Sequence, residues 1–293
     1  MLLDLSSYSL SDVTVISVCY HSDMVIGDMI ASVPTVTPII LVDNGCTNKF
    51  DQLPQDRTVS IIKMVENQGF GRGCNAGAQL AKTSLLMFLN PDARLSDGAL
   101  QALVDAANQY PSASAFNPRI VNSDGSAYFK RRSYLLPRRA WMKRGWPPKD
   151  CEVPVLSGAA LMVSKRYFHA AQGFDKEIFL YHEDDDLSLR LREFGTLVYV
   201  QKSEVIHAGG HSSGRSANVA YLKALHMAQS RVYTGRKYGR PFPALTTFFR
   251  AVLLLGSPVN LVSSRRRAKA LGMMVGSAMM LRSSWQKKTM SKT

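Results

Sequence analysis

The chemically most suggestive feature of the sequence is a run of four carboxylates, Glu-Asp-Asp-Asp at positions 183–186, directly before the helical pattern Leu187–Phe194. Four adjacent negative charges repel one another, but a helix N-terminus tolerates them because its dipole and free N–H groups favour anions. The run therefore has two interpretations. It is a well-capped helix start, or it is a site where one carboxylate takes a proton from a substrate or faces a metal-bound ligand.

Helical periodicity separates the members of this run. Leu187, Leu191 and Phe194 recur at i, i+4 and i+7, which predicts the buried face of the helix. Asp184 precedes Leu187 by three residues and is predicted to share that face, whereas the next two aspartates are predicted to point progressively away. Asp184 is therefore the candidate for a carboxylate that faces the interior or a cleft.

Two further carboxylates follow predicted strands. Asp43 opens an Asp-Asn-Gly turn after the strand Pro38–Val42, and Asp92 closes an Asn-Pro-Asp turn after the apolar strand Leu85–Leu89. Ligands of open α/β sheets bind at the carboxyl ends of strands. Asp43 could accept a hydrogen bond from a ribose or a base, and Asp92 could hold Mg²⁺ together with a substrate diphosphate. Ordinary tight turns explain both motifs equally well.

Two other segments have a functional and a structural interpretation. The glycine-rich stretch Glu66–Gly77 fails the dinucleotide-binding fingerprint because Cys74 stands where a third small residue is required. It is predicted to begin a glycine-rich helix that approaches a nucleotide closely. His207 ends a predicted strand before Ala-Gly-Gly-His, where imidazole could bind a transition metal or serve only the structure.

The elements that would position these residues alternate between strand and helix. Strands are predicted at Val13–Cys19, Pro38–Val42, Val59–Met64 and Leu85–Leu89, and helices at Asp23–Val33 and Gly69–Ala81. Such alternation predicts an α/β fold with a mostly parallel sheet flanked by helices. Beyond residue 111 we expect a hairpin that joins 119–121 to 126–130, separate strands at 197–200 and 204–207, and a long helix at 217–238.

Charge divides the chain into two parts. Residues 1–204 hold 21 Lys/Arg and 22 Asp/Glu, a net charge of −1, whereas residues 205–293 hold 15 Lys/Arg and no acid, a net charge of +15. We predict a catalytic domain at 1–240 and a basic amphipathic helical extension at 241–293. The extension predicts an anionic partner such as a membrane surface or nucleic acid; ordinary helices packed on the body are the alternative.

Composition narrows the class of protein. The 46% hydrophobic and 20% charged content is typical of a globular chain. No stretch approaches the roughly 18 apolar residues of a spanning helix, and the N-terminus lacks the pattern of a signal peptide. The four scattered cysteines form no Cys-x-x-Cys pair, which favours a reducing compartment and argues against a zinc site.

Taken in order, these motifs resemble the family 2 glycosyltransferases. The matching pieces are Val42–Gly45, Asn67–Gly71 with Asn75 and Gly77, Asn90–Asp92, Ser157–Ala159, and Gly173–Asp175 leading into Phe179–Leu187 with Arg190. Each is weak alone, but their order and spacing over roughly residues 13–212 are specific. The resemblance implies a GT-A fold and is closest to bacterial rhamnosyltransferase-like members that build cell-surface polysaccharides.

The resemblance also implies roles for individual residues. Asp184 would be the general base, and Asp92 with His207 would bind Mg²⁺ or Mn²⁺ at the donor diphosphate. Asn90 departs from the stricter Asp-x-Asp motif and lowers the charge of that site. Contacts with the donor nucleotide are implied for Asp43, Asn44, Asn67, Gly69, Phe70, Asn75, Asn90 and Asp92. Contacts with the substrate are implied for Ser157, Gly158, Glu183, Asp185 and Arg190.

The predicted reaction moves a sugar, with rhamnose as the first candidate, from a dTDP- or UDP-linked donor to a hydroxyl of a lipid-linked or oligosaccharide acceptor. A single base and the lack of an assigned carboxylate nucleophile favour inversion. The basic segment Lys130–Lys149, with Trp141 and Trp146, could hold an acceptor diphosphate. The tail would keep the enzyme on anionic lipid at the cytoplasmic face of the cell membrane.

Two alternatives to this enzyme remain. A nucleic-acid-binding protein could use the same basic tail, although no recognised nucleic-acid-binding motif is present, so we expect no nucleic acid partner. A nucleotide-sugar-binding module without catalysis would keep the same donor contacts.

Overall fold

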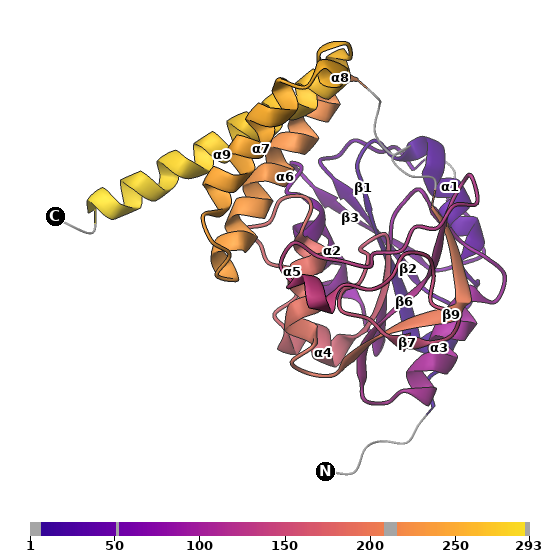
Figure 1. The fold of residues 1–293 in the computed structure, drawn as a ribbon. Helices are drawn as coiled ribbons and strands as arrows, with labels where there is room; N and C mark the ends of the chain where they lie inside the picture. The colour runs from indigo at the N-terminus through magenta and orange to yellow at the C-terminus, as the bar shows by residue number, and fades with distance from the viewer. Residues whose placement is uncertain (1–6, 51–52, 208–215, 291–293) are drawn as a thin grey trace. The chain divides into compact units, whose positions relative to one another are not determined.

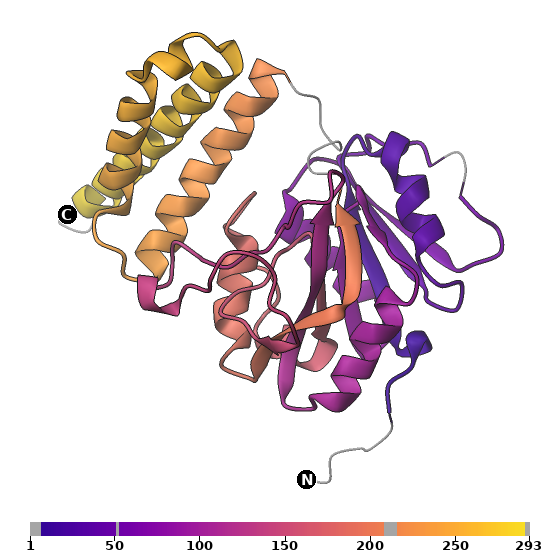
Figure 2. The same ribbon diagram turned by 45° about the vertical axis from the view of Figure 1, so that its right-hand side comes forward.

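The computed structural model describes residues 7–50, 53–207 and 216–290, except for the side chains at 259, 261 and 282–290. Two compact units are formed, one by Met1–Asp175 with Asp184–Ser212 and the other by Lys176–Glu183 with Ser213–Thr293. Figures 1 and 2 show the sheet of the first unit and the helices of the second from two sides. The functional division at residue 240 stays a prediction.

Among the described residues, the first unit is built on a nine-stranded mixed sheet. The strand order is β3-β2-β1-β4-β8-β6-β9-β5, and β7 pairs with β9. The strands are β1 Val13–Cys19, β2 Ile39–Asn44, β3 Val59–Met64, β4 Leu85–Leu89, β5 Ala93–Leu95, β6 Ala113–Asn122, β7 Cys151–Glu152, β8 Ala160–Ser164 and β9 Thr196–His207. The strands β1 to β4 are mutually parallel, whereas β8 runs antiparallel to both β4 and β6.

Helices cover both faces of this sheet. They are α1 Asp23–Ser32, α2 Phe70–Leu80, α3 Ala99–Gln109, α4 Lys165–Ala170 and α5 Glu183–Leu191. Successive strand side chains point to opposite faces, so Val15 and Leu41 join the core beneath α1 and α3. Ile16 and Val42 join the core beneath α2, α4 and α5. Burial on both faces explains the continuous apolar runs of these strands, and the predicted α/β fold is confirmed.

The glycines of α2 bring that helix close to the sheet. A Cβ at Gly73 would lie 2.8 Å from Cγ1 of Val18, and one at Gly77 would overlap the side chain of Ile16. The lack of a side chain at these two positions serves helix–sheet packing. The close approach of the segment to a nucleotide stays a prediction.

The hairpin turn predicted at 122–125 forms, because Asn122 N donates to Ser126 O at 2.9 Å, Tyr128 N donates to Ile120 O at 3.1 Å and Val121 pairs with Ala127 in an antiparallel bridge. Another local prediction after residue 111 is wrong. The strands predicted at 197–200 and 204–207 are one strand, β9, whose pairing with β6 skips from Val200 to Glu204. The skip arises where the backbone N–H of Gln201 donates to Asp150 instead of to β6.

The second unit is helical. It contains α6 Ala217–Lys237, α7 Pro243–Leu255, α8 Pro258–Leu261 and α9 Ser264–Met290. Helix α9 packs along α6 through Gly272 and Gly276, because a Cβ at either position would overlap the backbone of Tyr221 or Leu225. The long helix expected at 217–238 is confirmed. Within the described residues, no helix has the length and hydropathy needed to cross a membrane.

Candidate active site

The carboxylate of Asp184 lies at the start of α5 and is held by backbone and side-chain donors. Its Oδ2 accepts a hydrogen bond of 3.0 Å from the N–H of Gly158 and lies 2.5 Å from the ammonium of Lys130. Ser188, one turn later, accepts from the N–H of Leu156 at 2.9 Å and donates to the carbonyl of Asp184 at 2.6 Å. The start of α5 is thereby fixed against the segment that precedes β8.

The burial of the acidic run differs from the prediction. Asp184 is partly exposed, whereas Asp185 and Asp186 are buried, the latter completely. The expectation that the two later aspartates point away from the interior was wrong, because each has a cation beside it. Asp185 lies 3.0 Å from Lys130, and Asp186 forms a 2.6 Å ion pair with Arg190. Glu183 is also buried, and its contact with substrate stays a prediction.

The sheet register brings Asp92 and His207 together. His207 ends β9 opposite Ala93, the residue that follows Asp92. The His207 Nε2 atom lies 3.4 Å from Asp92 Oδ1 and 3.4 Å from Asn90 Nδ2. The other imidazole nitrogen, Nδ1, is buried and has no hydrogen-bond partner among the described residues. The predicted metal-ligating pair thus forms one cluster at a sheet edge.

One turn connects this cluster to the candidate base. In the turn 157–159, the carbonyl of Ala159 accepts from the N–H of Asn90, and the N–H of Gly158 donates to Asp184, both at 3.0 Å. Asn117 on β6 holds the turn, because its Oδ1 accepts from Ser157 N at 2.6 Å and its Nδ2 donates to Ser157 O at 3.1 Å. Sequence reasoning missed Asn117, because its strand carries no local signal for a functional residue.

The expected nucleotide end of the site lies at the end of β2. Asp43 is buried, and its Oδ1 accepts from Thr47 N at 3.0 Å and from Asn48 Nδ2 at 2.7 Å. No described residue donates to its Oδ2. Asn44 bonds to Asn67 at 3.0 Å and so ties the end of β2 to the loop before α2. Contacts of these three predicted residues with a nucleotide stay predictions.

Other predicted contact residues have internal partners. The side chain of Asn75 bonds at 2.8 Å to both the N–H and the carbonyl of Phe174, and the Phe70 ring packs edge-on against the Phe174 ring. Gly69 adopts a positive φ of 88° at the start of α2, which glycine permits. Arg190 donates to Asp186 and to the carbonyls of Ala171 and Gly173. Substrate contacts of these predicted residues stay predictions.

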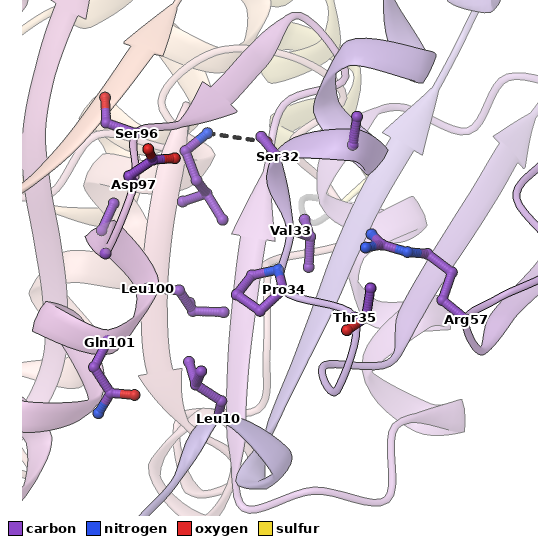
Figure 3. Close-up of a pocket in the computed structure, with 14 residues that line it drawn as sticks. Leu10, Ser32, Val33, Pro34, Thr35, Arg57, Ser96, Asp97, Leu100 and Gln101 are labelled. Atoms are coloured by element: carbon purple, nitrogen blue, oxygen red, sulfur yellow. Dashed lines mark hydrogen bonds between the residues drawn. The ribbon is translucent and has the colours of Figure 1, made fainter.

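A cavity in the first unit lies apart from the predicted site residues. It has a volume of about 410 Å³ and is lined by the end of α1, the start of α3 and Leu10. Figure 3 shows Leu10, Pro34 and Leu100 facing one another across it, with Asp97 and Arg57 at its sides. It contains none of the predicted site residues, and the Asp184 cluster remains the chemically equipped part of this unit.

The arrangement of this sheet and its helices is found in solved glycosyltransferases of the GT-A fold. The crystal structure of GalNAc-T7 with UDP, GalNAc and Mn²⁺ matches with a TM-score of 0.60 at 15% identity, covering 87% of this chain and 54% of that one. Mannosyltransferase PcManGT from Pyrobaculum calidifontis, in complex with GDP-Man and Mn²⁺, matches with a TM-score of 0.54 at 14% identity, covering 92% and 86%. These likenesses define the fold class.

Sequence comparison assigns the family within that class. The family model for glycosyl transferase family 2 matches residues 14–171. An N-acetylglucosaminyl-diphospho-decaprenol L-rhamnosyltransferase of Mycobacterium tuberculosis is 31% identical over 263 residues, which cover 79% of this chain and 85% of the relative. The chain belongs to glycosyl transferase family 2 and is a glycosyltransferase. The resemblance drawn from the motifs is confirmed.

Proposed function

We propose that this enzyme moves a sugar, rhamnose as the first candidate, from a nucleoside diphosphate donor to a hydroxyl of a lipid-linked or saccharide acceptor during synthesis of a cell-surface polysaccharide. The observation that carries the proposal is the turn 157–159, which bonds both to Asp184 and to the loop of Asp92. The turn thereby holds the candidate base, Asp184, and the loop of Asp92, where the donor diphosphate would bind. The mycobacterial relative, an N-acetylglucosaminyl-diphospho-decaprenol L-rhamnosyltransferase, supports rhamnose and a lipid-diphosphate acceptor.

Asp92 and His207 fit a divalent cation, Mg²⁺ or Mn²⁺. A carboxylate beside a buried imidazole whose Nδ1 has no described partner is a suitable donor set. The described residues contain no group of three such ligands, so the donor diphosphate and water would supply the others. When bound, the cation would neutralise charge on the departing nucleoside diphosphate. The Mn²⁺ in the two solved neighbours supports this assignment.

Asp184 would act as the general base. As the acceptor oxygen forms its bond to the anomeric carbon, the hydroxyl proton passes to Asp184. The bond between the anomeric carbon and the diphosphate oxygen breaks, and its electron pair leaves with the nucleoside diphosphate. One displacement inverts the anomeric configuration. Asp43, whose Oδ2 accepts no bond from a described residue, would receive a donor from the ribose or base of a dTDP- or UDP-sugar.

The test uses the full chain, Mn²⁺ or Mg²⁺, a panel of nucleotide sugars and a polyprenyl-diphosphate-linked N-acetylglucosamine acceptor. We expect one donor to raise the melting temperature in a metal-dependent way and to support transfer. Asp184→Asn should lower kcat at least about 100-fold and keep the donor-dependent rise in melting temperature. The matched control is Asp97→Asn, an exposed carboxylate outside the site. Full activity of Asp184→Asn would remove Asp184 from the mechanism.

We further propose that the second unit binds an anionic membrane surface. Helix α7 buries its small residues Ala244 and Ala251 and exposes large ones on another face. Leu245, Phe249 and Leu253 follow at i, i+4 and i+8 and are 42%, 61% and 76% exposed. Residues 205–293, to which α7 belongs, carry 15 Lys/Arg and no acid, and an exposed apolar stripe on such a basic segment is typical of an interfacial helix. Peripheral attachment to the cytoplasmic face of the membrane would follow.

Sedimentation with phospholipid vesicles tests this second proposal. The parent should bind vesicles that contain anionic lipid, and Phe249→Ser/Leu253→Ser should lose most of that binding. Met24→Ser/Val65→Ser is the matched control, because it removes two similarly exposed apolar side chains from the first unit. Equal binding by both double variants would contradict the role of α7. Binding to DNA at physiological salt, in place of vesicles, would favour a nucleic acid partner.

A further inference from the structure

Lys130 lies between the candidate base and its neighbour. Its ammonium is 2.5 Å from Asp184 Oδ2 and 3.0 Å from Asp185 Oδ1, and all three side chains are at most 20% exposed. Burial by itself would lower the pKa of Lys130, but Asp184 and Asp185 outweigh it and raise the pKa above its ordinary value. Lys130 therefore stays charged. No local sequence pattern indicates this pairing, because Lys130 and Asp184 lie 54 positions apart.

The hydrogen bonds of Asp184 distinguish its two oxygens. Oδ2 accepts from Gly158 N and contacts Lys130, while Oδ1 accepts from Asp185 N at 2.9 Å. Each carboxylate oxygen has two lone pairs. Oδ2 is therefore saturated by described donors, and Oδ1 retains one lone pair for a substrate hydroxyl.

We infer that Lys130 is a positioning residue of the transferase reaction: it holds Asp184 with Oδ1 turned toward the acceptor hydroxyl, and Asp185 keeps Lys130 paired when Asp184 takes the proton. This inference rests on the proposed role of Asp184 as the base. The three groups carry a net charge of −1 before the transfer and zero after it. When Asp184 takes the proton it becomes neutral, and the remaining charges of Lys130 and Asp185 balance each other. The transfer therefore leaves no unpaired charge buried in this cluster.

Two charged groups near this cluster have partners of their own. On α5, Asp186 is paired with Arg190. On the segment that carries Lys130, the next residue, Arg131, donates to the carbonyl of Met142 at 3.1 Å. Glu183, which precedes Asp184, is buried as well. Among the described residues, Asp184 and Asp185 are the charges that raise the pKa of Lys130. Substitutions at 130 and 185 should therefore act on the base through this ion pair.

The test is the dependence of kcat/KM on pH between about 4.5 and 9, which reports groups of the free enzyme. Lys130→Met removes the cation from two neighbouring carboxylates. The acid limb, which is the fall of kcat/KM at low pH, should therefore move to higher pH by about one unit or more. Asp185→Asn leaves Lys130 to Asp184 alone, so the acid limb should move to lower pH, and kcat should fall because the base is weaker. Lys130→Arg should return the limb toward that of the parent.

Opposite movements of the acid limb are the signature, since a merely structural ion pair would lower stability without moving the profile. Unshifted limbs, or limbs that move in the same direction in Lys130→Met and Asp185→Asn, would overturn the inference. Lys130→Arg keeps the test decisive if Lys130→Met does not fold. Inactive Asp184→Asn beside unshifted limbs would reject only the role of Lys130, whereas fully active Asp184→Asn would reject the base itself.

Discussion

A surface helix usually buries apolar side chains and exposes charged ones. Helix α5 departs from this rule by burying charged side chains, and helix α7 departs from it by exposing large apolar ones. Helix α5 buries carboxylates, including Asp185 and the fully buried Asp186. Helix α7 buries alanines and leaves Phe249 and Leu253 largely exposed. Burying a charge and exposing a large apolar side chain are both unfavourable unless something compensates them.

The difference between the two helices lies in where the compensation is found. On α5 it is internal, because Lys130 and Arg190 lie within 3.0 Å of the buried carboxylates. For the stripe on α7, no described residue provides a cover. The buried charges of α5 are thus compensated within this chain, whereas the exposed stripe of α7 has its only proposed cover in a membrane surface. Three predictions would break or sharpen this contrast.

The largest effect is expected from removing the internal compensation of α5. Arg190→Met leaves Asp186 charged and buried, so the free energy of unfolding should fall by about 3–5 kcal/mol. Urea denaturation at neutral pH measures it. Asp186→Asn/Arg190→Met leaves no unpaired charge and should recover a large part of the loss. A change in Arg190→Met below about 0.5 kcal/mol, the size of an ordinary surface substitution, would show that the pair is not what stabilises α5.

A smaller effect, on kcat, is expected when the carboxylate of Asp184 is displaced but keeps its charge. A Cβ at Gly158 would lie 3.3 Å from the Cβ of Asp184, so Gly158→Ala should push the carboxylate by a few tenths of an ångström. We expect kcat to fall about tenfold, because catalytic groups are sensitive to small misplacement. The KM for the donor should stay close to that of the parent.

The control for Gly158→Ala is Gly27→Ala. A Cβ at Gly27 has open space around it in the middle of α1. Alanine favours a helix over glycine by about 1 kcal/mol, so this variant should be at least as stable as the parent and equally active. Parental kcat in Gly158→Ala would mean that Asp184 tolerates the displacement.

The smallest effect on stability is expected at the exposed stripe of α7. Phe249→Ser and Leu253→Ser should each change the free energy of unfolding in solution by less than about 0.5 kcal/mol. Ala251→Leu, on the fully buried face of the same helix, should cost about 1–3 kcal/mol by overpacking. A cost above about 2 kcal/mol for Phe249→Ser, the range of a buried aromatic residue, would mean that the stripe is already covered.

Local patterns predicted the parts of the fold that depend on neighbours in sequence. The strands Val13–Cys19, Val59–Met64 and Leu85–Leu89 form with the expected bounds. The first and third are buried along their whole length, whereas Val59–Met64 is a partly exposed edge strand rich in β-branched residues. The predicted burial of Leu187 and Leu191 on α5 is confirmed, whereas Phe194, assigned to the same face, lies beyond the end of the helix and is exposed. Hydrophobic periodicity of this kind indicates whether a side chain is buried in the hydrophobic core.

Sequence could not predict the pairings across long separations. The burial of Asp185 depends on Lys130, which approaches from a distant loop, whereas the Asp186–Arg190 pair is an i,i+4 contact that helical spacing allows. Asn117 acts on a turn 40 residues later in the chain. Periodicity carries no information on which charged groups meet across such separations, because that is decided by the topology of the sheet.

The position of β9 in the sheet has a consequence for synthesis of the chain. Strand β5 ends at Leu95, and its described partner is β9, which ends at His207 more than a hundred residues later. A ribosome that adds about 5–20 residues per second needs on the order of ten seconds to reach that partner. During this interval the nascent chain carries an unfinished strand edge, which can pair with other chains. Slower elongation between 95 and 207 should therefore increase the demand for chaperones, long before the chemistry of the finished enzyme is at stake.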